Sequence, residues 1–329
     1  MKALKPQDEF PHEVGTEANF NESMYFNLYD PARGVGGFLR LAKRPNEGRG
    51  ERTVCLHLPD GTVAFDFARP TSPPTRPSTP PGCGWRLVEP YERLDISYTG
   101  DVMMLDDPDL MTETKAAFAT SPRAACSVRL TCRAAAPVYE HSFDGEGESF
   151  APNHYKQLMS VTGTIRVGDT DFRVDGFGLR DHSWGPRSWQ TPWYYRWLTG
   201  NCGADFGFMG AYFGSKDDDA RHGGFVWDGG TLHPCEAVEL ETSWTDSTGY
   251  HQGIRAVFRA GEREWPVTGR VLNRIPLRNR RRDADGDVLG TRITEGLTRW
   301  ETSDGRTGYG MSEYLDQMID GRPVAQNVF

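Results

Sequence analysis

The chain has 329 residues, a net charge of −9 at pH 7 and a mean hydropathy of −0.60. Its 37 glycines and 22 prolines favour many short elements joined by turns and argue against a helical bundle. No window of the sequence reaches the roughly 18 apolar residues that a membrane helix needs. The acidic charge argues against nucleic-acid binding, which needs a basic face. Composition therefore excludes an integral membrane protein and disfavours a nucleic-acid partner.

Alternating apolar and polar residues predict β-strands along much of the chain. Three pairs of these strands are joined by turn residues and predict hairpins. The pairs are residues 53–58 with 63–67, 159–167 with 172–179, and 297–301 with 307–314. Only residues 109–120, between Pro108 and Pro122, carry a clear helical signal. These patterns predict an all-β fold.

Two polar stretches interrupt the predicted strands. Residues 69–84 contain the run PTSPPTRPSTPPG, which cannot pack a core and predicts a surface loop. Residues 140–152 are acidic and rich in glycine, and we place a domain boundary there. The prediction is an N-terminal β domain at 1–145 and a C-terminal β domain at 146–329. The basic run at 278–282 predicts a solvated hairpin tip, with a site for a phosphate-bearing ligand as the alternative.

The six cysteines form no CxxC pair and have no histidines at zinc-ligand spacing. The first twenty residues contain no apolar stretch of the kind found in signal peptides. Free thiols and a cytoplasmic location are therefore expected. Because β domains with exposed strand edges tend to pair, we also expect a homodimer.

Charged and aromatic side chains are densest at residues 175–189, which read DGFGLRDHSWGPRSW. In a regular strand alternate residues share a face, so Arg180, His182 and Trp184 are expected on one face. Asp181 then lies among apolar neighbours on the other face, where burial raises the pKa of a carboxyl group. A raised pKa suits a general acid, and His182 is a candidate partner base.

The charged and aromatic side chains in and around residues 175–189 are the candidate site residues. The expected catalytic residues are Asp181, His182, Tyr194 and Tyr195. The expected substrate-binding residues are Arg180, Arg187, Trp184, Trp189, Trp197, His154 and Asp175. The alternative for the charged residues is structural ion pairing, and for the aromatic residues it is ordinary packing. No HExxH, GxGxxG or GxSxG pattern occurs, so we expect neither a metal nor an organic cofactor.

The run RDHSWGPR at 180–187 resembles the Asp-His-Asn-Trp-Gly signature of the AttH and carotenoid 1,2-hydratase group, with Ser183 in place of the asparagine. Weaker similarity covers residues 21–23, 154–157 and 300–313, and the chain looks closest to a bacterial branch of the group. The resemblance implies two lipocalin-like (calycin) antiparallel β-barrel or sandwich domains packed together. It also implies that Asp181 is the proton-donating residue.

Three functions remain open on the sequence. The first is a cofactor-independent lyase, such as a hydratase, dehydratase, eliminase or carbon–carbon lyase, that acts by acid/base chemistry. Its substrate would be an apolar terpenoid, steroid or lignin-derived aromatic molecule, and an isomerase or cyclase on the same substrates is an alternative. The second is a carrier of lipophilic ligands, and the third is a structural or assembly role. Fold alone does not choose among them.

Overall fold

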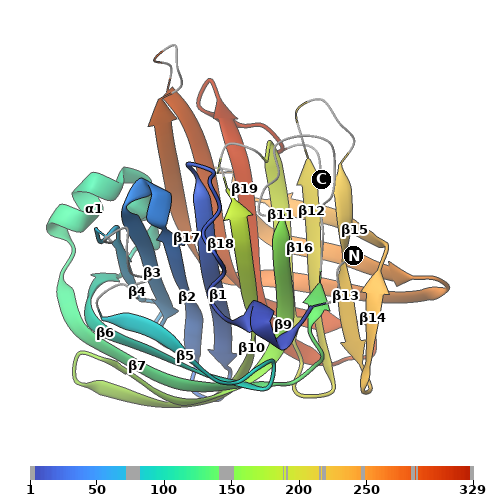
Figure 1. Cartoon of the computed structure of the whole chain (residues 1–329). Coiled ribbons are helices and arrows are strands. Elements are labelled where there is room, and N and C mark those ends of the chain that lie inside the picture. Colours follow the sequence, from blue (N-terminus) through green and yellow to red (C-terminus); the bar gives the residue numbers. More distant parts are fainter. Residues whose placement is uncertain are drawn as a thin grey trace. The chain divides into compact units, whose positions relative to one another are not determined.

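The structure is a computed structural model that describes residues 4–71, 82–140, 152–187, 189, 192–214, 216, 220–245, 249–282, 286 and 288–326 (Figure 1). The chain forms two compact units. The first unit comprises Met1–Asp107 and Thr120–Ser188, and the second comprises Pro108–Ala119 and Trp189–Phe329. Each unit is built on one antiparallel sheet, which confirms the all-β prediction.

The first unit begins with a short 3₁₀ helix, η1 (Pro6–Glu9), and a second one, η2 (Pro45–Glu47), follows β2. Its sheet has ten strands. They are β1 (Phe20–Asp30), β2 (Val35–Arg44), β3 (Arg49–His57), β4 (Val63–Ala68), β5 (Cys83–Glu89), β6 (Arg93–Leu105), β7 (Arg123–Ala134), β8 (Tyr139–Glu140), β9 (Asn153–Val167) and β10 (Thr170–Pro186).

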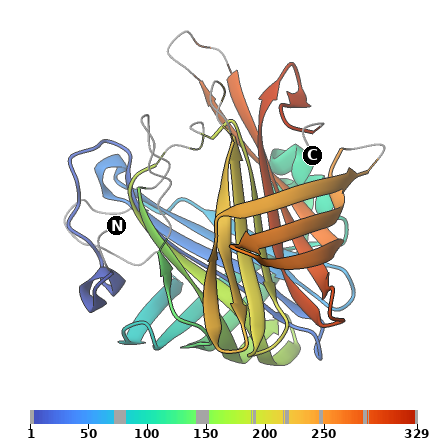
Figure 2. The ribbon, with the colours of Figure 1, turned by 90° about the vertical axis from the view of Figure 1, so that its right-hand side faces the viewer.

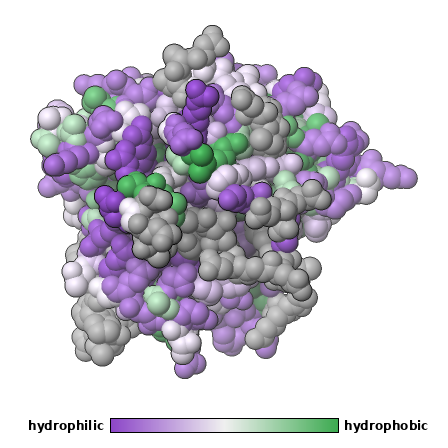
Figure 3. All heavy atoms as spheres, turned by 90° about the horizontal axis from the view of Figure 1, so that it is seen from above, coloured by the Kyte–Doolittle hydropathy of each residue, from purple (hydrophilic) through white to green (hydrophobic). Residues whose placement is uncertain are grey.

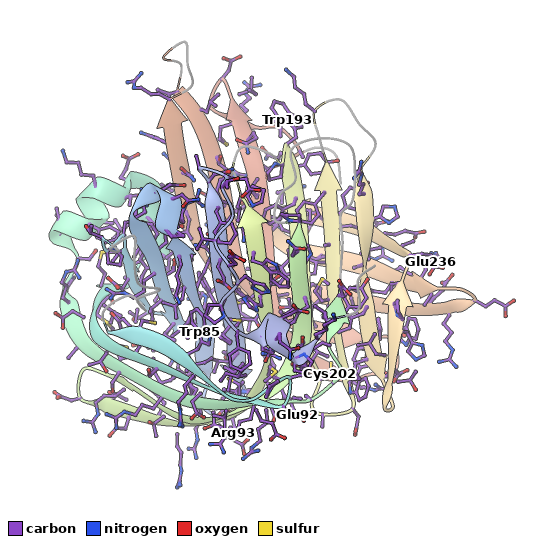
Figure 4. The ribbon with its side chains drawn as sticks, viewed as in Figure 1. Trp85, Glu92, Arg93, Trp193, Cys202 and Glu236 are labelled. Carbon is purple, nitrogen blue, oxygen red and sulfur yellow. The ribbon has the colours of Figure 1, made fainter. Side chains whose placement is uncertain are left out.

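This first sheet closes into a barrel, because β10 pairs with β1 on one side and with β9 on the other. Alternate residues of each strand point inward and form one apolar core, which includes Phe26, Leu39, Ile96 and Val161. Trp85 on β5, labelled in Figure 4, packs against this core from a partly exposed position. Closure pairs both edges of the sheet, which satisfies their backbone hydrogen bonds.

The second unit also has a ten-stranded sheet. Its strands are β11 (Tyr194–Asn201), β12 (Phe206–Gly214), β13 (Arg221–Asp228), β14 (Thr231–Cys235), β15 (Ala237–Trp244), β16 (His251–Ala260), β17 (Arg263–Arg282), β18 (Val288–Thr302), β19 (Thr307–Ile319) and β20 (Arg322–Pro323). The described sheet runs from β14 at one end to β15 at the other.

The second sheet folds back over its own inner face. Figure 2 shows the orange strands β15 to β17 lying across the yellow strands β12 and β13. The two layers share one core, in which Phe208 of β12 contacts Phe258 of β16 and Trp300 of β18. Trp193, labelled in Figure 4, precedes β11 and donates its backbone N–H to Gly214.

The division into units differs from the expected one. Strands β9 and β10, expected in the C-terminal domain, hydrogen bond with β7 and β1 of the first sheet. The expected boundary at 145/146 lies outside the described residues, and the chain passes from the first unit to the second at Ser188 and Trp189. The reason is that strand pairing is non-local, so a polar stretch between strands marks a loop and not a change of sheet.

The predicted helix belongs to the second unit. It is found as a 3₁₀ turn, η3 (Pro108–Glu113), followed by α1 (Thr114–Thr120). Asp109 of η3 forms an ion pair with Arg274 of β17, with an N–O distance of 2.8 Å. The three predicted hairpins are present as β3–β4, β9–β10 and β18–β19. The run at 278–282 ends β17, and most of the loop predicted at 69–84 lies outside the described residues.

No helix in the part of the chain that the structure describes combines the length and apolar character needed to cross a membrane. In the view from above, hydrophilic side chains dominate the coloured surface and hydrophobic ones form only small groups (Figure 3). Large apolar side chains that are more than half exposed include Phe10, Val288 and Ile319, which are far apart in the sequence. Scattered exposure of this kind is ordinary for a folded protein surface.

Candidate functional site

Strand β10 carries the RDHSWGPR run and divides it between the two faces of the first sheet. Its pairing with β1 and β9 is regular through residues 180–184, without a bulge. Val174, Arg180, His182 and Trp184 therefore share the inner face, where Val174 is part of the barrel core. Asp181 and Ser183 lie on the opposite face. The expected pairing of Asp181 with His182 as acid and base is therefore wrong, because the sheet separates their side chains.

On the outer face, Asp181 forms an ion pair with Lys156. The two residues are direct cross-strand partners on β10 and β9, and Lys156 Nζ lies 3.1 Å from Asp181 Oδ2. The Lys156 side chain is 5% exposed and that of Asp181 is 20% exposed. Burying a lysine costs desolvation free energy, which offsets much of its attraction to a single carboxylate. Such a pair is therefore weak evidence for a purely stabilising role.

The charges around Asp181 reverse the expected shift of its pKa. Burial by itself raises the pKa of this carboxyl group, but the positive charges of Lys156, His154 and Arg187 outweigh burial and lower it. Burial lowers the pKa of Lys156, and the carboxylate of Asp181 opposes that shift. Asp181 is therefore ionised near neutral pH and is a proton acceptor. The prediction that Asp181 has a raised pKa and donates a proton near neutral pH is therefore wrong.

Three neighbours complete this group, which we call the outer cluster (His154, Lys156, Asp181, Ser183 and Arg187). His154 is buried and is the cross-strand partner of Ser183. Arg187 Nη1 donates a hydrogen bond to Ser183 Oγ at 3.2 Å. The sequence predicted His154, Asp181 and Arg187 as site residues but missed Lys156. The missed signal is parity, since His154 and Lys156 are two residues apart and must share a face.

The inner face of β10 carries a second polar group. Arg180 Nη1 lies 2.8 Å from Glu9 Oε2, and both side chains are 1% exposed. Arg180 also donates to Gln157 Oε1 from Nε at 2.9 Å and from Nη2 at 2.5 Å. Tyr155 donates its hydroxyl proton to Glu9 and lies 3.1 Å from His182 Nδ1. Arg180 is therefore a buried structural ion-pair residue, not an exposed anion-binding group.

This inner group extends to the N-terminal segment through Glu22. His182 Nε2 and His12 Nδ1 approach the same oxygen, Glu22 Oε1, at 3.1 and 3.0 Å. Burial raises the pKa of Glu22, but hydrogen bonds and charge from His12 and His182 lower it to about 2. The His12 ring stacks on Trp184 with a centroid distance of 3.9 Å. Within the described ranges, these two histidines and Glu22 form the group whose ligand atoms converge as a metal site requires.

The expected site residues downstream of β10 lie in the second unit. Tyr195 donates its hydroxyl proton to Glu313, whereas Tyr194 lies on the other face of β11, beside Arg196. Trp197 shares the face of Tyr195 and is buried. Burial raises the pKa of Tyr194, which keeps its hydroxyl protonated. The two adjacent tyrosines therefore do not act on one substrate from one face.

Trp189 and Asp175 do not belong to the outer cluster. Trp189 belongs to the second unit, where its carbonyl accepts a hydrogen bond from Gln317 Nε2 at 2.9 Å. Asp175 lies on β10 but its side chain is exposed. Its backbone N–H donates to Asp30 Oδ2 at 2.9 Å. The exposed Asp175 side chain is thus no part of the outer cluster, and the substrate contact expected of Trp189 stays a prediction.

The second unit has a polar interior that the sequence did not predict. Arg196 is fully buried and its guanidinium lies 3.0 Å from Asp316 Oδ1. His251 Nε2 lies 2.8 Å from Ser312 Oγ, and the His251 ring stacks on Tyr314 at 3.9 Å. Burial and the nearby arginines lower the pKa of His251 to about 3. His251 is therefore neutral, and its contact with Ser312 is a structural hydrogen bond.

Comparison with known proteins places the chain in a family. A family model described as a domain of unknown function, DUF7064, matches residues 5–318. The chain belongs to this family. No protein of curated function matches it in sequence.

Solved structures with the same fold include proteins of the AttH group. A protein assigned as AttH from Nitrosomonas europaea has 17% identity and a TM-score of 0.60 over 95% of this chain and 97% of that chain. Kievitone hydratase from Nectria haematococca has 10% identity and a TM-score of 0.59, covering 89% and 88%. CghA with Sch210972 has 12% identity and a TM-score of 0.56, covering 91% and 88%. The resemblance of this DUF7064 member to the AttH-like lipocalin fold is thus confirmed.

Proposed function

We propose that this protein is a hydratase-type lyase that adds water to, or removes it from, an apolar molecule with a phenolic or alcoholic oxygen. The observation that carries the proposal is the ion pair between Lys156 and Asp181 on the outer face of the first sheet. It joins a proton acceptor to a proton donor at 3.1 Å, beside the charges of His154 and Arg187. The AttH-like fold, which kievitone hydratase shares, supports the proposal.

The proposed reaction uses both members of the pair. In the dehydration direction, the Asp181 carboxylate takes the proton from the carbon next to the hydroxyl-bearing carbon. The electrons of that C–H bond form the C=C bond, and the hydroxyl group leaves as water after it takes a proton from the Lys156 ammonium. The proton on Asp181 then returns to the neutral Lys156 amine, which restores both groups. Hydration is the same sequence in reverse.

The lowered pKa of Lys156 suits this role, because an ammonium that releases its proton more easily is a better acid near neutral pH. Arg187 provides a fixed positive charge for a substrate oxygen that gains negative charge. Every proton in the scheme moves between side chains, substrate and water, so the proposed chemistry uses no organic cofactor. Terpenoid, steroid and lignin-derived aromatic alcohols or alkenes are the substrate classes to test. The homodimer and the cytoplasmic location stay predictions.

The test is a panel of such alcohols and alkenes, assayed by mass spectrometry for the loss or gain of one water. Reactions in D₂O report whether deuterium enters the carbon next to the hydroxyl-bearing carbon, as the proposed proton transfer requires. We expect Asp181→Asn and Lys156→Met each to lower kcat by about 100-fold or more, the usual contribution of a general acid or base. Asp171→Asn is the matched control, because Asp171 forms an exposed ion pair with Arg166 on the same two strands.

Three outcomes would contradict the proposal. Full turnover by a folded Asp181→Asn variant would show that the carboxylate takes no part in the reaction. Tight binding of a panel member without any turnover by the wild-type protein would favour the carrier function. A rate loss in Asp171→Asn equal to that in Asp181→Asn would mean that the variants report on strand pairing and not on chemistry.

A further inference from the structure

We propose that His12, Glu22 and His182 form a binding site for one divalent transition-metal ion of the zinc class. The three residues come from the segment before β1, from β1 and from β10. They lie on the inner face of the first sheet, so the site is separate from the outer cluster proposed for catalysis. Two imidazoles and one carboxylate are the donor set that Zn²⁺ accepts in sites with three protein ligands.

The ligand atoms already converge. His12 Nδ1, His182 Nε2 and Glu22 Oε1 all lie within 4.8 Å of one another. The two nitrogens lie 3.0 and 3.1 Å from the same carboxylate oxygen. Ligands that are 2.0–2.2 Å from a tetrahedral Zn²⁺ are roughly 3.4 Å apart, so both N–O distances are close to this spacing. The two nitrogens, which lie within 4.8 Å of each other, complete the arrangement by settling to the same spacing around the ion.

Counting protons on the inner face also favours a cation between His182 and Glu22. The Glu9 carboxylate is paired with Arg180, so the hydroxyl proton of Tyr155 is donated to Glu9. The Tyr155 oxygen must then accept the Nδ1 proton of His182 at 3.1 Å. With that proton on Nδ1, His182 directs its Nε2 lone pair toward Glu22 Oε1 at 3.1 Å, the orientation that a shared metal ion requires.

The remaining nitrogen of His182 has an oxygen partner, as is usual for metal-binding histidines, whereas that of His12 is buried without a hydrogen-bond partner among the described residues. Tyr155 holds Nδ1 of His182, and Asp8 Oδ1 lies 3.7 Å from Nε2 of His12. Trp184 stacks on the His12 ring with an interplanar angle of 10° and fixes the plane of the ring. These contacts orient both imidazoles toward Glu22 without any rearrangement of β10.

The electrostatics of Glu22 suit a metal ligand. Its buried carboxylate also accepts the backbone N–H of His12, which lies 3.2 Å from each oxygen and holds the carboxylate beside both rings. Lys43 is the other cation near Glu22, and burial lowers the pKa of that lysine while Glu22 raises it. Asp8 adds a second negative charge near His12. A divalent ion would therefore enter a site that already carries net negative charge when the histidines are neutral.

A bound ion would also join the N-terminal segment to the barrel. His12 precedes β1 and is the one ligand whose side chain is appreciably exposed, at 19%. Glu9 of the same segment is held at the inner face by Arg180. Metal binding should therefore protect residues before β1 from proteolysis, an effect that does not depend on catalysis.

The experiment is isothermal titration of chelator-treated full-length protein with Zn²⁺, together with the absorption spectrum after Co²⁺ addition. We expect one ion per chain, and at least a tenfold loss of affinity in His12→Ala and in Glu22→Gln. His222→Ala is the matched control, because His222 is an exposed histidine of the second unit. Zn²⁺ should also slow proteolysis of the N-terminal segment in the wild type but not in His12→Ala.

Wild-type protein that binds no Zn²⁺ would overturn the proposal. Zn²⁺ binding that His12→Ala leaves unchanged would overturn it as well. Because His12 is partly exposed, its alanine variant should fold, and circular dichroism checks this. The cysteine thiols are poor competitors, since burial raises the pKa of Cys202 to about 11 and of Cys235 to about 12. The readouts are binding and protection, so their failure leaves the lyase proposal untouched.

Discussion

A double-mutant cycle on the outer cluster tests whether Lys156 and Asp181 act as a unit. At 3.1 Å and an effective dielectric constant of about 20, their attraction is about 5 kcal/mol before desolvation is subtracted. Removing one partner of a buried pair typically costs about 3–5 kcal/mol, because the other charge is left without compensation. The Asp181 side chain is 20% exposed, so water relieves part of that penalty and places the expected costs at the lower end.

We therefore expect Asp181→Asn to lower the free energy of unfolding by about 3 kcal/mol, since the Lys156 ammonium stays buried. Lys156→Met should cost about 2 kcal/mol, because the remaining carboxylate is partly hydrated and close to positive groups. The double variant has no uncompensated charge and should be no less stable than Asp181→Asn alone. The resulting coupling is about 2 kcal/mol, well above the error of such cycles.

The assay is urea unfolding followed by both circular dichroism and tryptophan fluorescence, because a chain with two units need not unfold in one step. The comparison cycle uses Arg166 and Asp171, an exposed ion pair on the same two strands. Solvent screens that pair, so its coupling should not exceed the error. If the costs of Lys156→Met and Asp181→Asn add to within about 0.5 kcal/mol, the two side chains are independent and the reasoning fails.

Three further predictions concern groups away from this pair. Glu9→Gln should lower the free energy of unfolding in urea by about 3 kcal/mol because Arg180 loses its buried partner, whereas Glu13→Gln at an exposed position should not; equal effects would contradict the buried pair. The pKa of His251 is lowered to about 3, below its ordinary 6.5, so the unfolded chain binds the extra proton first and stability should fall as pH drops from 6.5 toward 3. His251→Phe should reduce that loss between pH 7 and pH 5, and an unchanged slope would speak against it. Cys202, the one cysteine that is not fully buried (Figure 4), should be alkylated first in the native protein, as peptide mapping would show, although its raised pKa keeps the reaction slow.

Local patterns predicted the elements well because their causes are local. The turn at 303–305 is an example, since Gly305 has a φ of +86° that an Asp-Gly pair readily adopts. Alternation of residue type correctly placed Arg180 and His182 on the same side of their strand. The helix signal at 109–120 was also local, and the structure confirms it as η3 and α1.

The composition of the site was not predictable, because it depends on which strands pair. Lys156 meets Asp181 only through the register of β9 with β10, and Glu9 meets Arg180 across 171 positions of sequence. The sign of the Asp181 pKa shift followed from this pairing, since burial alone predicts a raised value. The ligands His12, Glu22 and His182 likewise show no metal-site spacing in the sequence.

The register of β10 decides the chemistry of both faces. A slip by one residue would move Asp181 inward and His182 outward, so each proposed site requires the register found here. Two contacts near the motif hold that register. A Cβ at Gly178 would collide with the backbone oxygen of Asn27, and Leu179 N–H donates to Asn27 Oδ1 at 2.9 Å. Gly178 therefore permits the close approach of β1. The resulting register keeps Asp181 and Lys156 on one face of the first sheet and His182 and Glu22 on the other.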